Sequence, residues 1–162
     1  MPINLSRAQF YPPRPDEDIY DLNVRAVWIT AGLNPAEVVI SLDGGTGHEH
    51  AEFAICRNDA ASMAELLRIA LGGSEALLPR VELLRAHLYR GDALIAEGIC
   101  ADYVTATPDI NPPAISIGLS TTHSDAWWNQ GYGLEFDVSP EGAEEMIARL
   151  EELARPWQEC SC

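Results

Sequence analysis

The sequence contains no lysine. All ten of its basic residues are arginine, and against 25 acidic residues they leave a formal charge of −15. The absence excludes a phosphate-loop lysine, a Schiff-base lysine and a lysine general base. A strongly negative surface repels nucleic acid and anionic membranes, so neither is expected as a direct partner. The charge is explained most simply by solubility, and the alternative is a surface that attracts a basic partner or imitates nucleic acid.

The chain also lacks long apolar runs and a cysteine framework. No segment approaches the roughly 20 apolar residues needed to span a bilayer. Met1–Arg7 has no apolar signal-peptide core, so a cytoplasmic location is expected. Cys56 and Cys100 lie in apolar contexts typical of free, packed thiols, while Cys160 and Cys162 are too few to hold a metal alone.

The length of 162 residues and a hydrophobic content of 47% are those of one globular domain. Residues 1–22 are rich in proline and acid, which predicts an extended N-terminal arm. Residues 23–157 are expected to form a single α+β domain, and residues 158–162 a flexible tail.

Two parts of the domain repeat each other's apolar spacing. Three residues recur 83 positions later: Phe53, Met63 and Leu67 as Phe136, Met146 and Leu150. Upstream, Ile40-Ser-Leu42 matches Ile115-Ser-Ile117, and Trp28 matches Tyr103, at a spacing of 75. The pattern predicts an internal duplication of a strand–strand–strand–helix unit, about 24–71 and 100–154, joined by a connecting hairpin at 75–99. The second copy would then carry about eight extra residues before Phe136.

The expected helices have recognisable ends. Asn58 or Asp59 is predicted to cap the first helix, and Gly72 with Gly73 to end it. The second is predicted to have Ser139 as its cap and Pro140 in its first position, and to end at Pro156. Residues 81–90 are compatible with helix or strand, and Gly91-Asp92 favours the strand of a hairpin.

These elements predict an α+β fold: a mainly antiparallel sheet with two helices packed on one face. The other sheet face would stay open to a ligand, a partner or a second subunit, so a homodimer through that face is one alternative.

The loop at 120–133 is the strongest candidate binding site, because it joins flat aromatic rings to short polar groups and is absent from the first copy. Its candidate residues are His123, Asp125, Trp127, Trp128, Asn129 and Tyr132. The alternative is that the two tryptophans cover the core.

The histidines suggest a second hypothesis, a small metal-dependent or histidine–carboxylate hydrolase using His48, His50 and His123. His48 and His50 would share one side of a strand, but no convincing third and fourth metal ligands follow. Residues 121–125 contain histidine, serine and aspartate, but adjacent residues in a loop rarely meet in triad geometry, and no Gly-x-Ser-x-Gly elbow is present. The sequence therefore favours a non-enzymatic protein that binds a protein partner or small ligand, with no metal or cofactor.

Overall fold

The structure, a computed structural model, describes residues 2–11, 20–44, 49–78, 83–90, 93–97, 103–110, 113–121 and 132–160. The strands are β1 (Ile3–Tyr11), β2 (Tyr20–Asp21), β3 (Ala26–Ala31), β4 (Glu37–Asp43), β5 (Glu49–Cys56), β6 (Ala76–Leu78), β7 (Leu83–Arg90), β8 (Ala93–Glu97), β9 (Tyr103–Ile110), β10 (Pro113–Thr121) and β11 (Tyr132–Val138). The helices are α1 (Arg57–Leu71) and α2 (Pro140–Cys160).

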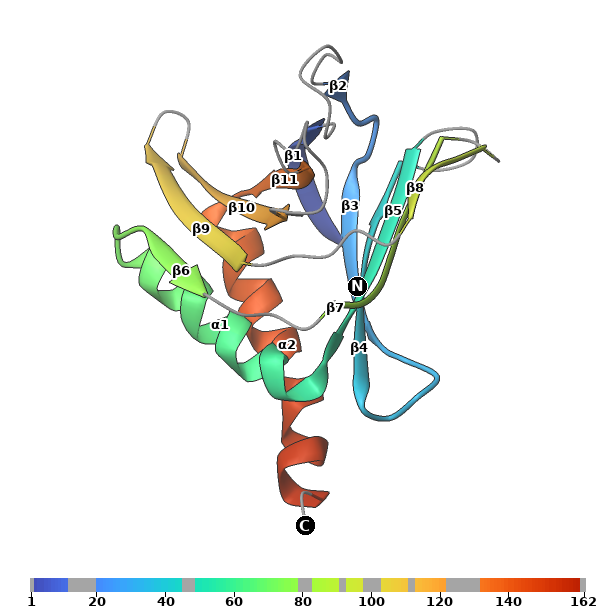
Figure 1. Cartoon of the computed structure of the whole chain (residues 1–162). Coiled ribbons are helices and arrows are strands. Elements are labelled where there is room, and N and C mark those ends of the chain that lie inside the picture. Colours follow the sequence, from blue (N-terminus) through green and yellow to red (C-terminus); the bar gives the residue numbers. More distant parts are fainter. Residues whose placement is uncertain are drawn as a thin grey trace.

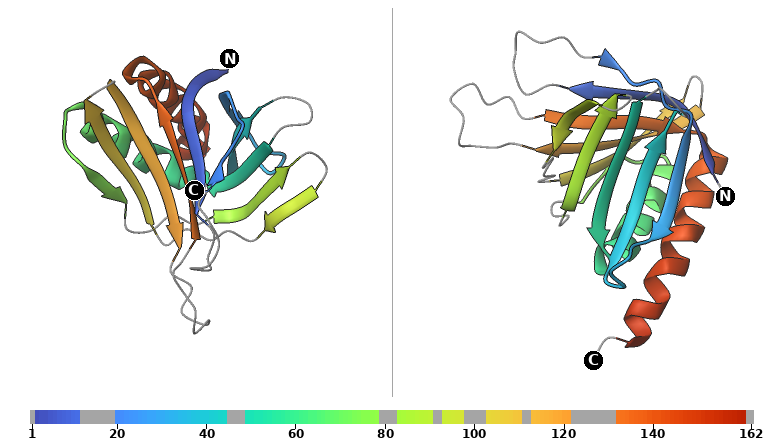
Figure 2. Two further views of the ribbon diagram at one scale, coloured as in Figure 1. Left: turned by 90° about the horizontal axis from the view of Figure 1, so that it is seen from above. Right: turned by 90° about the vertical axis from the view of Figure 1, so that its right-hand side faces the viewer.

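The described strands form one antiparallel sheet in the order β6-β9-β10-β11-β1-β3-β4-β5-β7-β8, with β2 paired to β1. We call β3, β4, β5, β7 and β8 the first half-sheet, and β6, β9, β10 and β11 the second. The half-sheets are inclined to each other, so the sheet is curled (Figures 1 and 2).

Strand β1 joins the two half-sheets. It pairs with β3 through Ile3 and Asn4, and then with β11 from Leu5 to Tyr11. Ile3 and Ala8 are buried in the core. The structure therefore differs from the extended arm expected for residues 1–22, because residues 3–11 form a strand with buried apolar side chains. The proline-rich composition belongs to the segment after Tyr11.

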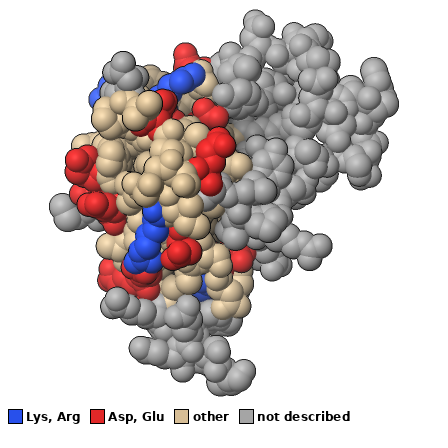
Figure 3. Space-filling model, turned by 90° about the vertical axis from the view of Figure 1, so that its left-hand side faces the viewer, with Lys and Arg blue, Asp and Glu red and all other residues tan. Residues whose placement is uncertain are grey.

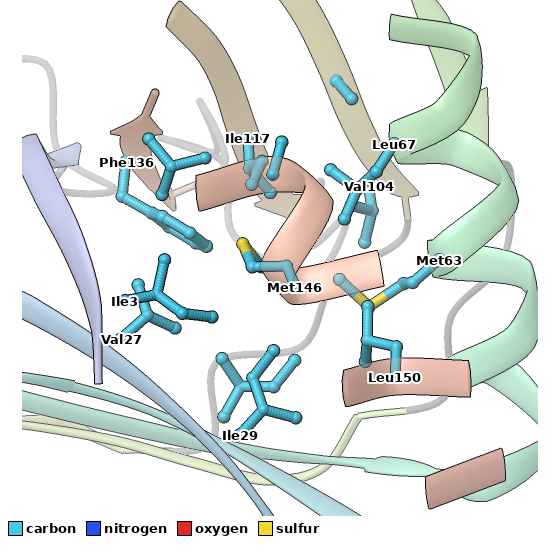
Figure 4. Packing of buried hydrophobic residues seen from close by; sticks show 14 of the residues in the cluster. Ile3, Val27, Ile29, Met63, Leu67, Val104, Ile117, Phe136, Met146 and Leu150 are labelled. Carbon is cyan, nitrogen blue, oxygen red and sulfur yellow. The ribbon is translucent and has the colours of Figure 1, made fainter. Parts of the chain in front are cut away.

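Both helices contact strands of both half-sheets and lie on the same side of the sheet (Figure 1). Their apolar stripes meet the inward side chains of the sheet in one core (Figure 4). Its fully buried members include Val27, Ile40, Met63, Leu67, Ile117, Phe136, Met146 and Leu150. The expected α+β class, an antiparallel sheet with two packed helices, is confirmed.

The helix starts follow the prediction in one case and not in the other. Ser139 Oγ accepts a hydrogen bond from the Gly142 N–H at 3.0 Å, and Pro140 is the first residue of α2, as predicted. In α1 the predicted cap at Asn58 or Asp59 is wrong. Strand β5 runs directly into the helix, and Cys56 occupies the cap position without a side-chain hydrogen bond.

The helix ends follow the prediction in α1 and not in α2. α1 ends at Leu71 with Gly72 as its C-cap, and Gly73 takes a positive φ of 96°, which glycine adopts without strain. The predicted end of α2 at Pro156 is wrong, because the helix continues to Cys160. It therefore includes the first part of the expected tail, and residues 161–162 lie outside the described residues. The Arg57 guanidinium donates from α1 to the Leu153 carbonyl of α2 at 2.6 Å.

The strand registers correct the sequence alignment. Phe53 pairs with Ile40, and Phe136 pairs with Ile117. Ile40 and Ile117, which are 77 positions apart, therefore occupy matching positions in their two ladders, whereas Ile115 pairs with Val138. The alignment at a spacing of 75 was wrong by two residues, because side chains alternate with a period of two and a shift of two leaves the buried pattern unchanged.

The strands that flank β5 and β11 show a further similarity. In the sheet, Phe53 pairs with Ala86 of β7 and Phe136 pairs with Ala8 of β1. Each ladder skips one residue, Leu84 of β7 in the first and Ser6 of β1 in the second. The two strands share Leu, Arg, Ala and Tyr at matching places in Leu5-Ser-Arg-Ala-Gln-Phe-Tyr11 and Leu83-Leu-Arg-Ala-His-Leu-Tyr89.

Candidate functional site

Most of the predicted aromatic loop lies outside the described residues. This applies to His123, Asp125, Trp127, Trp128 and Asn129. The two ends of the loop are described: Thr121 and Tyr132 form the last pair of the β10–β11 ladder. Both strands are interior to the sheet, since β9 flanks β10 and β1 flanks β11. The loop is therefore attached at both ends to strands that are paired on both sides.

The acidic, proline-rich segment 12–19 is attached beside the loop. It follows Tyr11, which pairs with Gly133 at the start of β11, and it returns to the sheet at Tyr20 in β2. Residues 12–19 are Pro-Pro-Arg-Pro-Asp-Glu-Asp-Ile. The aromatic loop and this acidic segment therefore leave the same end of the second half-sheet, from neighbouring strands.

On the sheet face away from the helices, the first half-sheet carries an exposed tryptophan. Trp28 is 40% exposed, and its neighbours Val27 and Ile29 point into the core. Ser41 is its partner on β4, and Glu52 is the partner of Ser41 on β5. This row places a flat aromatic surface in line with a carboxylate.

His50 lies beside that row, between two carboxylates. Its Nδ1 is 3.9 Å from Asp43 Oδ1, its register partner on β4, and its Nε2 is 3.6 Å from Glu52 Oε2. Both distances are too long for hydrogen bonds, so the contacts are ion pairs only when the imidazole is protonated.

The hydrolase alternative is only partly visible, since His48 and His123 lie outside the described residues. Within the described part of the chain, no group of three histidine, cysteine or acidic side chains is arranged to hold a metal ion.

A groove of about 330 Å³ lies beside α2, and it was not predicted from the sequence. It is lined by Pro2, Ile3, Ile29, Glu145, Ala148, Arg149 and Glu152. Arg149 Nε donates to the Ile29 carbonyl at 2.9 Å, and its Nη1 lies 3.3 Å from Glu152 Oε1. The spacing of Glu145, Arg149 and Glu152 marks one polar helix face in the sequence, but it does not reveal which strand lies beside that face.

A buried arginine was also missed. Arg57 is only 8% exposed, and among the described residues its Nε has no hydrogen-bond partner. Its Nη1 donates to the Leu153 carbonyl, so the guanidinium links the start of α1 to the later part of α2.

On the face shown in Figure 3, acidic side chains cover more of the described surface than arginine side chains, which form small isolated patches. Arg68 lies between two carboxylates, those of Glu65 and Glu151. No helix in the described ranges is long and apolar enough to cross a membrane.

Comparison of the chain with protein-family models, with curated proteins and with solved structures found no match.

Proposed function

We propose that this chain is a non-enzymatic binding protein that engages a protein partner or a small ligand through the loop at 120–133 and its acidic surface. The contact residues in this proposal are His123, Asp125, Trp127, Trp128, Asn129 and Tyr132. Indole and phenol rings provide contact area at low entropic cost, and the short polar groups provide direction.

The observation that carries the proposal is the attachment of the loop. Its ends, Thr121 and Tyr132, are paired with each other on two interior strands, so the positions from which the aromatic residues extend are fixed by the sheet. Binding residues are commonly carried on loops that a rigid scaffold positions. The acidic segment 12–19 leaves the same end of the sheet and adds negative charge, which favours a partner with a basic surface.

The equivalent connection in the other half supports a role beyond folding. Asp43 pairs with His50, so six residues join β4 to β5, whereas ten residues join Thr121 to Tyr132. The shorter connection is enough to close the same kind of strand pair. The additional residues in the second connection include both Trp127 and Trp128.

We also infer that the chain is an internal duplication that extends over most of it, residues 3–71 and 83–154. The matching Leu, Arg, Ala and Tyr positions of β1 and β7 support this, as do the skipped residues Ser6 and Leu84. The corrected register adds a shared turn sequence, Leu33-Asn-Pro35 and Ile110-Asn-Pro112. In such a duplication each copy begins with a strand that pairs with the last strand of the other copy.

The binding proposal is tested with the immobilised full chain, the double variant Trp127→Ala/Trp128→Ala and the control Trp28→Ala, which removes an exposed indole outside the loop. Wild type and control are expected to retain the same bound protein or small molecule from a lysate of the source cell, identified by mass spectrometry. The loop variant is expected to lose it while keeping the melting temperature of the wild type. Equal retention by the loop variant would contradict the proposal.

A further inference from the structure

The groove beside α2 combines an apolar floor with a charged rim. Pro2, Ile3, Ile29 and Ala148 supply the apolar lining, and Glu145, Arg149 and Glu152 the charges. Its volume of about 330 Å³ lies at the lower end of the range for ligand sites. The lining residues come from β1, β3 and α2, all outside the loop of the proposed function.

In this groove, the Arg149 side chain binds to the edge of β3. Strand β1 pairs with β3 only at Ile3 and Asn4, which leaves the edge of β3 without a strand partner from Trp28 onward in the described part of the chain. The Ile29 carbonyl on that edge accepts the Arg149 Nε–H. Because the side chain occupies the acceptor that an added strand would use, an occupant has to bind here through its side chains.

The charged side chains at the rim of the groove favour an occupant with positive charge. Arg149 is engaged by Glu152 and by the Ile29 carbonyl, and the two carboxylates outnumber the one guanidinium. Glu145 and Glu152 are seven positions apart on α2, which separates them by about 10 Å along the helix axis. A single cationic group cannot reach both. Two basic side chains three residues apart in a polyproline-type segment are separated by about 9 Å, on the same side of that segment.

We propose that this groove docks an extended basic segment of a protein partner. One aliphatic side chain of the segment enters the groove against Ile3, Ile29 and Ala148, and a basic side chain on either side of it pairs with Glu145 and Glu152. The charge of −15 on the whole chain raises the rate at which such a segment arrives.

The probe is a fluorescein-labelled peptide with the core Arg-Ile-Pro-Arg, titrated into the full chain at constant salt and followed by fluorescence anisotropy. The variant Glu145→Gln removes one rim charge. Glu144→Gln is the matched control, because it removes the same charge from an exposed neighbour that does not line the groove. Glu145→Gln is expected to raise the Kd roughly threefold to fivefold, and Glu144→Gln to leave it within about twofold.

A second peptide with serine in place of isoleucine tests the apolar part, and it is expected to bind at least about tenfold more weakly, as for a buried aliphatic side chain. Melting temperatures establish that both variants are folded. The proposal is overturned if the two glutamine variants weaken binding equally, if the serine peptide binds as tightly, or if the first peptide does not bind. None of these results bears on the loop, because no loop residue is changed.

Discussion

Arg68 of α1 and Glu151 of α2 form an ion pair, with 2.5 Å between Arg68 Nη2 and Glu151 Oε2. The hydrogen bond to Glu151 raises the pKa of Arg68 above its usual value. The two residues are 83 positions apart, which is also the spacing between Met63 and Met146. Under the proposed duplication they are corresponding residues of the two helices. A contact between corresponding residues lies on the approximate twofold axis that would relate the two copies.

A charge exchange tests this pair. Arg68→Glu alone places like charges beside Glu151 and Glu65, and we expect a small decrease in melting temperature that high salt reduces, because the site is exposed. The double variant Arg68→Glu/Glu151→Arg restores opposite charges and should recover most of the loss. Equal melting temperatures for the single and double variants would mean that the pair does not contribute to stability.

The two helix caps give a matched comparison, since Ser139 follows Cys56 by the same 83 positions. Ser139→Ala removes the acceptor of the Gly142 N–H and should lower the free energy of unfolding by about 1 kcal/mol, whereas Ser139→Asp should retain it. Cys56 has no side-chain capping bond, so Cys56→Ser should raise the free energy of unfolding by up to about 1 kcal/mol. Urea unfolding measures all three, and a loss of stability in Cys56→Ser would show that packing of the half-buried thiol outweighs the new cap.

Metal removal should have no effect on stability. His50 has two carboxylates near it, but the described residues contain no set of three metal-binding side chains. Treatment with a chelator should therefore leave the melting temperature unchanged. A decrease of several degrees, together with stoichiometric metal in the purified protein, would restore the metal-dependent alternative and place its ligands among His48, His50 and His123.

Local patterns predicted the helices and most of the strands. The 3.6-residue spacing around Met63 and Met146 marks both buried helix faces. Gly72-Gly73 end a helix and Ser139-Pro140 begin one through local backbone effects, so these signals can be recognised in a single sequence. The register between strands was not predicted, because a shift of two residues preserves the alternation of buried and exposed side chains.

Features that depend on distant segments were also missed. Strand β1 was overlooked because its pairing partner β11 begins more than 100 residues later, and the proline-rich segment after Tyr11 dominated the composition. Arg149 gave no local sign that it would reach the Ile29 carbonyl, which is 120 positions away. The candidate loop was predicted from its composition, and its role stays a prediction because residues 122–131 lie outside the described ranges.

The most direct test of the central claim is the melting temperature of Trp127→Ala and Trp128→Ala. If the tryptophans serve binding, each variant should melt within about 2 °C of the wild type, as is usual for surface substitutions. If they cover the core, truncation would cost about 3–5 kcal/mol, and the melting temperature would decrease by roughly 10 °C. The account predicts the first result, and the second would contradict it.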